Sequence, residues 1–236
     1  MKINKSIDME NFNINDFRSF YKSLNPYQMS AFNDIMKKAS DSYINPSIIE
    51  ERELHVTQLD VFSRLMMDRQ IYFGHEVNQD TCNITIAQLL YLDSVGHEDI
   101  TMYLCSPGGL VVDGFGLVDT MGMIKSDINT IGTGMAASMG SLLIASGTRG
   151  KRKALKDTWV MLHQLSSGFS GKFRDILIEA EFCKKLTDML YNHLAQRTGQ
   201  SYDVIKDACE HGDNWLSADE SKAFGLIDEV IVPKWD

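Results

Sequence analysis

Three short apolar segments each end in a small-residue turn or in a histidine, and this pattern constrains the fold more than any other feature. Residues 100–105 (ITMYLC) lead into a Ser-Pro-Gly-Gly turn at 106–109. Residues 128–131 (INTI) lead into a stretch of glycine and alanine, and residues 159–162 (WVML) end at His163. Apolar strands that alternate with helical patterns are typical of a buried, mainly parallel sheet. The sequence therefore predicts an α/β fold.

The other predicted elements come from the spacing of apolar residues. A period of three to four residues predicts a helix, and short runs bounded by turns predict strands. A helix that begins at Asp80 or Thr81 is expected from their capping side chains. The remaining predictions are a helix over 56–68, a strand over 70–73, the end of the capped helix near Leu92, and helices at 113–125 and 141–146.

The longest helical pattern runs from residue 172 to about 198. Gly199 follows it, and glycine is the usual residue just beyond a helix end. A helix of this length rises about 40 Å, which exceeds what a compact domain of this size can cover. Its apolar stripe therefore needs a partner, so the sequence predicts an oligomer.

Residues 1–50 differ in composition from the rest of the chain, being rich in Asn, Asp, Ser and Lys. Two short amphipathic helices are predicted at 14–23 and 27–39, and Asn45-Pro46 breaks the pattern. We interpret 1–50 as an N-terminal extension, either a propeptide or a terminal arm. Residues 51–236 then form the main domain.

The charge balance argues against a nucleic-acid partner. The 236 residues carry 23 basic and 32 acidic side chains, a net charge of −9, whereas nucleic-acid binders usually show a basic excess. The one dense basic run, residues 149–153, is interpreted as a solvated turn.

The four cysteines, the N-terminus and the apolar runs together predict a cytoplasmic protein. No two cysteines are spaced as C-x-x-C, so no zinc or thioredoxin-like site is indicated and the thiols are expected to be reduced. The N-terminus has no apolar signal segment. No apolar run approaches the ~18 residues of a membrane span, so no membrane association is predicted.

Ser138 is a candidate nucleophile because it lies at a strand-to-helix junction crowded with small residues. Such a junction permits a sharp turn, and the amide end of the following helix favours a developing anion. The local sequence does not match the G-x-S-x-G motif. The alternative interpretation of Ser138 is an ordinary small residue in a tightly packed turn. The turn at Gly108-Gly109 is compatible with an oxyanion-binding N–H or with a plain loop.

His163 ends an apolar strand, where sites gather in parallel sheets, although a lone histidine there is more often structural. Asp213 is expected in a loop before a helix, where by itself it is a turn or cap residue. The chain order Ser138, His163, Asp213 differs from the orders of the α/β-hydrolases, chymotrypsin and subtilisin, so those folds are disfavoured.

The chain resembles the ClpP family, the proteolytic subunits of the caseinolytic (Clp) protease, from about residue 50 to 232. Several independent motifs occur in the family's order over three quarters of the chain. They are DVFSRL (60–65), SPGG (106–109), DTM (119–121), GMAASMG (134–140), GKR (150–152), MLHQ (161–164), LSA (216–218) and AFGLID (223–228).

The resemblance implies a serine-peptidase site. The family's catalytic residues fall on Ser138, His163 and Asp213, and its oxyanion hole on the backbone N–H groups of Gly109 and Met139. It implies hydrolysis of peptide bonds without a metal or another cofactor.

The resemblance also implies an architecture and partners. The expected fold is the ClpP/crotonase-like fold of stacked β-β-α units, with helix 172–198 as a protruding handle between two rings. The expected assembly is a homo-oligomer of heptameric rings stacked as a tetradecamer. A separate AAA+ unfoldase ATPase would supply unfolded polypeptide, which would bind as an extended strand beside the long helix.

The chain departs from the family at positions near the site and at the expected contacts. Cys105 stands where the family has Asn, Leu165 replaces the usual Pro, and no arginine adjoins Asp213. The expected ring-contact segment at 166–171 is altered. Of the aromatic positions in the family's docking groove, two are occupied by Thr101 and Lys153, whereas Tyr103 and Met123 remain plausible liners.

Two alternatives from other functional classes remain at this point. A catalytically weak or regulatory ring subunit would assemble with a catalytic paralogue. A crotonase-type acyl-CoA enzyme would share the fold and the oxyanion geometry but has no need of a Ser/His/Asp set.

Overall fold

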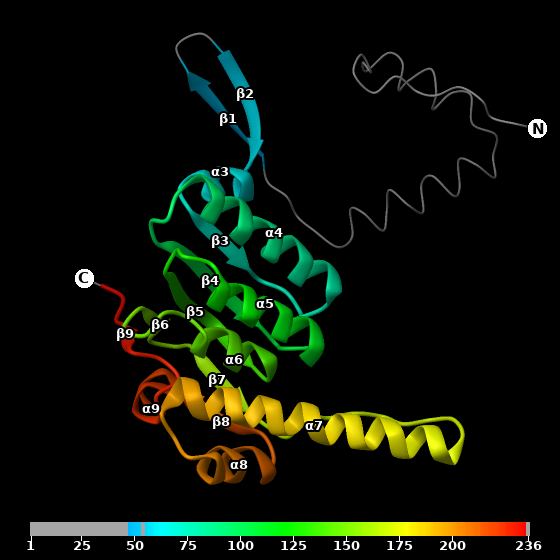
Figure 1. Ribbon diagram of the computed structural model, residues 1–236. Helices are drawn as coiled ribbons and strands as arrows, with labels where there is room; N and C mark the ends of the chain where they lie inside the picture. Colours follow the sequence, from blue (N-terminus) through cyan, green and yellow to red (C-terminus); the bar gives the residue numbers. More distant parts are fainter. Residues whose placement is uncertain (1–46, 53–54, 235–236) are drawn as a thin grey trace, which may run out of the picture. The chain divides into compact units, whose positions relative to one another are not determined.

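The computed structural model describes residues 47–52 and 55–234 (Figure 1), with side chains described from residue 60 onward. The chain divides into two compact units between Val61 and Phe62, and each is described by itself. The helices predicted at 14–23 and 27–39, and the break at Asn45-Pro46, lie outside the described residues.

The described part of the first unit is an antiparallel hairpin. Strand β1 (Ser47–Arg52) pairs with β2 (His55–Asp60) over all six positions of each strand. The prediction of one helix over 56–68 was therefore wrong in its first half. The helix α3 covers only Val61–Met67, because pairing with β1 gives the backbone of residues 55–60 hydrogen-bond partners that the local spacing did not reveal.

The second unit is built on a seven-stranded sheet. Its main path runs in the order β3-β4-β5-β6-β9, with every neighbouring pair parallel. Strand β7 pairs parallel with the end of β5 and antiparallel with β8, which forms a second branch. The strands are β3 (Gln70–Phe73), β4 (Ile100–Ser106), β5 (Ile128–Ala137), β6 (Arg152–Leu155), β7 (Trp159–Leu162), β8 (Asn214–Ser217) and β9 (Glu229–Ile231).

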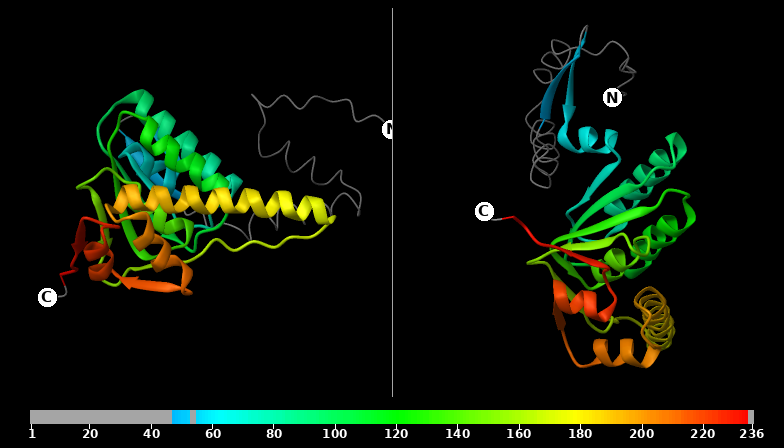
Figure 2. Two further views of the ribbon diagram at one scale, coloured as in Figure 1. Left: turned by 60° about the horizontal axis from the view of Figure 1, so that its bottom comes forward. Right: turned by 90° about the vertical axis from the view of Figure 1, so that its left-hand side faces the viewer.

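Three helices pack on one side of this sheet (Figure 2, right) and enclose the apolar core. They are α4 (Gln79–Val95), α5 (Val111–Met123) and α6 (Met139–Ala145), and all seven residues of α6 are buried. The predicted helices at 113–125 and 141–146 thus begin two residues earlier. The start of α4 also differs, since Asn78 is its cap and Thr81 completes a capping box.

Strand β5 continues six residues past its predicted end, and this extension leads to the candidate site. Residues 130–132 pair with β6, whereas residues 135–137 pair with β7. Between them Gly134 has φ of 84°, a conformation that favours glycine. The strand therefore changes partners at Gly134 and delivers Ser138 beside the end of β7.

The long helix was predicted correctly. Helix α7 spans Phe173–Thr198 and ends at Gly199, whose backbone is left-handed with φ of 79°. Its buried residues, Leu190, Tyr191 and Leu194, all lie in the C-terminal third. The rest of α7 exposes large apolar side chains, and α8 (Tyr202–Glu210) and α9 (Ala218–Phe224) follow it.

The basic run at 149–153 is more than a solvated turn, because Lys151, Arg152 and Lys153 form ion pairs and part of the run is β6. The Arg152 side chain is only 6% exposed and makes a two-pronged contact with Asp228, at 2.6 Å from Nη2 to Oδ1 and 2.9 Å from Nε to Oδ2. The Nζ of Lys151 lies 2.6 Å from a carboxylate oxygen of Asp99 and 2.9 Å from one of Asp127.

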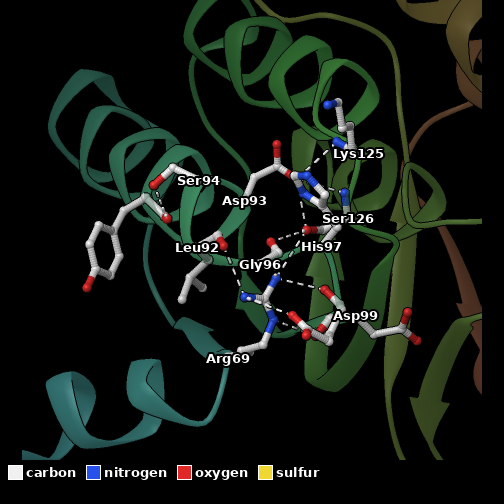
Figure 3. Close-up of polar contacts among 11 residues, drawn as sticks. Arg69, Leu92, Asp93, Ser94, Gly96, His97, Asp99, Lys125 and Ser126 are labelled. Atoms are coloured by element: carbon white, nitrogen blue, oxygen red, sulfur yellow. Dashed lines mark hydrogen bonds and ion pairs between the residues drawn. The ribbon is translucent and has the colours of Figure 1, made fainter.

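A second polar cluster joins the starts of β3, β4 and β5 (Figure 3). The Arg69 guanidinium donates to the carbonyl oxygens of Leu92 and Gly96 at the end of α4, and to Glu98 O at 2.7 Å. Asp93 accepts hydrogen bonds from the backbone N–H and the hydroxyl of Ser126. These contacts fix the strand starts, at the opposite ends of β4 and β5 from Ser106 and Ser138.

The cysteines agree with the sequence-based expectation, and all four are free thiols. None of the helices in the described part of the chain combines the length and the apolar character needed to cross a bilayer.

Candidate active site

Ser138 occupies a sharp turn between β5 and α6. Its φ of 55° and ψ of −122° are unusual for a residue with a side chain, and within the described chain only Arg69 is another non-glycine residue with positive φ. Its N–H donates to Met161 O at 2.9 Å, and its carbonyl oxygen accepts from Ser141 N at 2.9 Å and Ser141 Oγ at 2.6 Å. These bonds hold the strained backbone, and such strain gathers at functional sites.

The Ser-Pro-Gly-Gly turn packs directly against this serine, and its first glycine has no room for a side chain. A Cβ on Gly108 would lie 2.6 Å from the Cβ of Ser138 and 2.6 Å from Ala137 O, and Gly108 has φ of 90°. A Cβ on Gly109 would collide with Val77 O, and its φ is 146°. Both glycines are therefore required by close backbone approach.

Substituting Gly108→Ala is expected to reduce peptidase turnover by at least about 100-fold. The new methyl group would displace the serine turn, and displacements of about 1 Å at a reacting centre cost about this much. Steady-state turnover of a short fluorogenic peptide measures the effect. Gly116→Ala on α5 is the matched control, because in the described chain the only neighbouring atom within 4 Å of its added Cβ is Ile86 Cδ1 at 3.8 Å, an ordinary van der Waals contact. Near-normal turnover in Gly108→Ala would contradict the close packing.

The two backbone groups expected to form the oxyanion hole lie beside the serine. Gly109, Ser138 and Met139 line one cavity together with His163. Met139 is the first residue of α6, a position whose N–H has no partner within the helix. The geometry thus brings both groups to the same place, and their role stays a prediction.

His163 contacts both other members of the predicted set. Its Nε2 lies 2.7 Å from Ser138 Oγ, and its Nδ1 lies 3.6 Å from Asp213 Oδ1. The first distance is a hydrogen bond, and the second exceeds one. Such contacts often tighten only when substrate binds.

The antiparallel pairing of β7 with β8 explains why His163 faces Asp213. Leu162 pairs with Asn214. Because the strands are antiparallel, the residue after Leu162 lies opposite the residue before Asn214, and these residues are His163 and Asp213. The expectation that Asp213 precedes a helix was wrong, since it directly precedes β8. The Asp213 side chain is 61% exposed, compared with 25% for His163, so water reaches the aspartate more readily than the histidine.

The site also includes a pocket that has an apolar wall in addition to its serine and histidine side chains and that local sequence patterns did not indicate. Leu190 and Leu194 belong to the apolar stripe of the long helix, and their spacing gave no signal of a cavity. Burial raises the pKa of the Cys209 thiol to about 12, so this lining thiol is neutral at neutral pH. Its apolar lining comprises Val111, Leu162, Leu165, Leu190 and Leu194.

Within the described residues, no group of three or more His, Cys, Asp or Glu side chains is arranged to hold a metal ion. A serine with a strained backbone, hydrogen-bonded to a histidine that in turn faces an aspartate, is the arrangement found in serine peptidases.

Comparisons with known proteins agree with this arrangement. The family model described as Clp protease matches residues 52–234. A Bacteroides fragilis protein named "ATP-dependent Clp protease proteolytic subunit" is 50% identical over 202 residues, 85% of this chain and 97% of the relative. Proteins of the same name from Bacteroides thetaiotaomicron and Porphyromonas gingivalis are 46% and 42% identical, over 94% and 92% of this chain and 100% and 98% of the relatives.

The chain belongs to the Clp protease family. The resemblance predicted from its motifs is thus confirmed, as are the ClpP/crotonase-like fold and the class of Clp-type peptidase. The crotonase-type acyl-CoA alternative is set aside. The match to the B. thetaiotaomicron protein covers 222 residues, and it extends into the N-terminal extension because residues 51–236 number only 186.

Proposed function

We propose that this chain is a serine endopeptidase subunit that hydrolyses peptide bonds of unfolded polypeptides. The observation that carries the proposal is the 2.7 Å contact between Ser138 Oγ and His163 Nε2 at a strained turn. The proposed reaction requires the hydroxyl to donate to Nε2, which is the case in the tautomer that carries its proton on Nδ1, the nitrogen that faces Asp213.

The proposed reaction follows from this proton arrangement. Ser138 Oγ attacks the peptide carbonyl while His163 Nε2 accepts its proton, and the N–H groups of Gly109 and Met139 stabilise the oxyanion. The imidazolium then protonates the leaving amine. A water molecule, deprotonated by the same histidine, then attacks the acyl carbon, and the imidazolium returns the proton to Ser138 Oγ as the acyl–Oγ bond breaks. Asp213 orients the imidazole throughout.

The apolar wall of the pocket bears on which side chain the enzyme accepts at the substrate residue just before the cleaved bond. The wall next to Ser138 carries leucine side chains from α7 and the neutral thiol of Cys209. A charged side chain placed there would lose its hydration without gaining a partner. We propose that the pocket accepts apolar side chains.

Labelling with a fluorophosphonate tests this function without a knowledge of the substrate. The reagent reacts with an activated serine, so mass spectrometry should locate it on Ser138 in the full-length assembled protein. Labelling of Ser138 supports the peptidase. Absence of labelling in an assembled sample would favour the alternative of a catalytically weak or regulatory subunit that acts with a paralogue.

The proposed assembly is a pair of stacked heptameric rings that enclose the sites, fed by a separate AAA+ ATPase in the cytoplasm. The curated relatives are named as ATP-dependent. The exposed apolar side chains of α7 support burial in an assembly, because Phe173, Leu177 and Phe182 are 77%, 54% and 53% exposed. We also propose that residues 1–50 form an extension that is removed near 45–52 by the peptidase itself.

A further inference from the structure

One face of the β5, β7 and β8 branch carries two exposed tryptophans, and it ends at the candidate site. Trp159 and Trp215 are 48% and 44% exposed on this face. The opposite faces of β7 and β8 point into the core, where Val160 is 0% and Leu162 is 1% exposed and Leu216 packs against them. Large exposed aromatic side chains next to one another on a sheet mark a surface that binds something.

The strand registers show that the two tryptophans share a face and are neighbours. Met161 pairs with Trp215, Trp159 pairs with Ser217, and Met135 of β5 pairs with Trp159. Because side chains alternate along a strand, Trp159 and Met161 lie on one face, and their partners across the ladder share it. On this face Met161 is only 8% exposed, so the two tryptophans supply most of the accessible apolar surface, and Ser217 adds a polar side chain. We call the four residues Met135, Trp159, Met161 and Trp215 the tryptophan face.

The same alternation connects the tryptophan face to the site. His163 is two residues beyond Met161 on its strand, and Asp213 is two residues before Trp215. The contact between His163 and Asp213 therefore continues the row of cross-strand pairs that includes Met161 and Trp215. At about 3.3 Å per residue, the face extends about 13 Å from His163 to Trp159, the length of about four extended residues.

We propose that the tryptophan face binds apolar side chains of the polypeptide substrate on one side of the bond to be cleaved. This inference rests on the proposed function, and it adds a substrate class: unfolded segments rich in leucine and aromatic residues. The occupant is the substrate rather than another protein because the face is continuous with the residues proposed to act on it. Each exposed indole offers a rigid apolar surface, which loses little conformational entropy on binding.

The experiment compares three substrates on the full-length protein. The first is an internally quenched peptide of about 12 residues, long enough to cover the face, with leucine at the cleaved bond and apolar flanks. The second has serine in place of those flanking residues. The third is a fluorogenic dipeptide that reaches only the pocket. Its kcat/KM serves as the reference value for each variant.

Trp159→Thr and Trp215→Thr should each raise KM for the apolar-flanked peptide about tenfold. The ratio of its kcat/KM to that of the dipeptide should fall accordingly, whereas the ratio for the serine-flanked peptide should stay near wild type. Trp159→Phe and Trp215→Phe retain an aromatic ring and should recover most of the loss. Tyr91→Gln is the matched control, since Tyr91 on α4 is an aromatic side chain of similar exposure, 56%, elsewhere in the molecule.

Two outcomes would overturn the inference. The first is an equal KM change for the apolar-flanked and serine-flanked peptides. The second is a change of molecular mass in light scattering on Trp→Thr substitution, which would assign the face to a contact between copies of the chain. Fluorophosphonate labelling of Ser138 separates this failure from failure of the proposed function, because the label does not require the tryptophan face.

Discussion

Ser138→Ala is expected to eliminate turnover of a short fluorogenic peptide, with a loss of at least about 10⁴-fold, while the assembly stays intact. The Ser138 Oγ that lies 2.7 Å from His163 Nε2 is the proposed nucleophile, and among the described residues no other hydroxyl makes that contact. Removal of the nucleophile from a serine-peptidase triad typically costs this much or more. Steady-state turnover measures the loss, and light scattering measures the assembly.

Ser94→Ala is the matched control, because Ser94 is an exposed serine on α4 whose hydroxyl bonds only locally, to Tyr91 O. Substantial turnover by Ser138→Ala would remove Ser138 from the role of nucleophile. The same pair of proteins tests the N-terminal extension by intact mass. Wild type should lose residues up to about 45–52 while Ser138→Ala retains them, and equal full-length masses would show that no self-processing occurs.

Asp228→Asn is expected to lower the free energy of unfolding by about 3 kcal/mol at pH 7. The Arg152 guanidinium is 6% exposed, and this substitution would leave its charge buried without a counterion. Asp228 Oδ2 also accepts from Gly150 N at 2.7 Å and Arg152 N at 3.0 Å, so the carboxylate joins β6 to the segment before β9. The asparagine keeps the shape but loses the charge and an acceptor.

The pH dependence of this effect has a definite sign. Burial by itself would raise the pKa of Asp228, but hydrogen bonds and the charge of Arg152 hold that pKa below its usual value of 3.8. A lowered pKa in the folded state means that the stabilisation is present above about pH 4 and is lost as the pH falls below it. The difference between wild type and Asp228→Asn should therefore shrink in acid.

Urea denaturation at a fixed protein concentration, at neutral and acidic pH, measures both effects. Asp219→Asn is the control, because Asp219 is 64% exposed and its partner Lys156 is 45% exposed. Loss of such a surface pair should cost less than about 1 kcal/mol. Equal midpoints for wild type and Asp228→Asn at pH 7 would show that Arg152 finds another counterion.

Local patterns were sufficient where short-range spacing decides the structure. The strand at 159–162 and the helix ending at Gly199 agree with the sequence because an apolar run and a left-handed cap act over a few residues. The small residues around Ser138 likewise predicted a sharp turn, and the strand ending at His163 predicted a residue at a sheet edge. Asp213 is different, because only the family resemblance distinguished it from a turn residue.

The sequence by itself thus determined the α/β class, the long helix and the positions of Ser138 and His163 at strand ends. Only the tertiary structure decided which distant residues those strand ends contact. Strand β2 was misread as helix because its partner β1 supplies the hydrogen bonds from outside the segment. The contact of His163 with Asp213, the ion pair of Arg152 with Asp228 and the pairing of Met161 with Trp215 each join residues 50 or more positions apart. No local periodicity records such pairings.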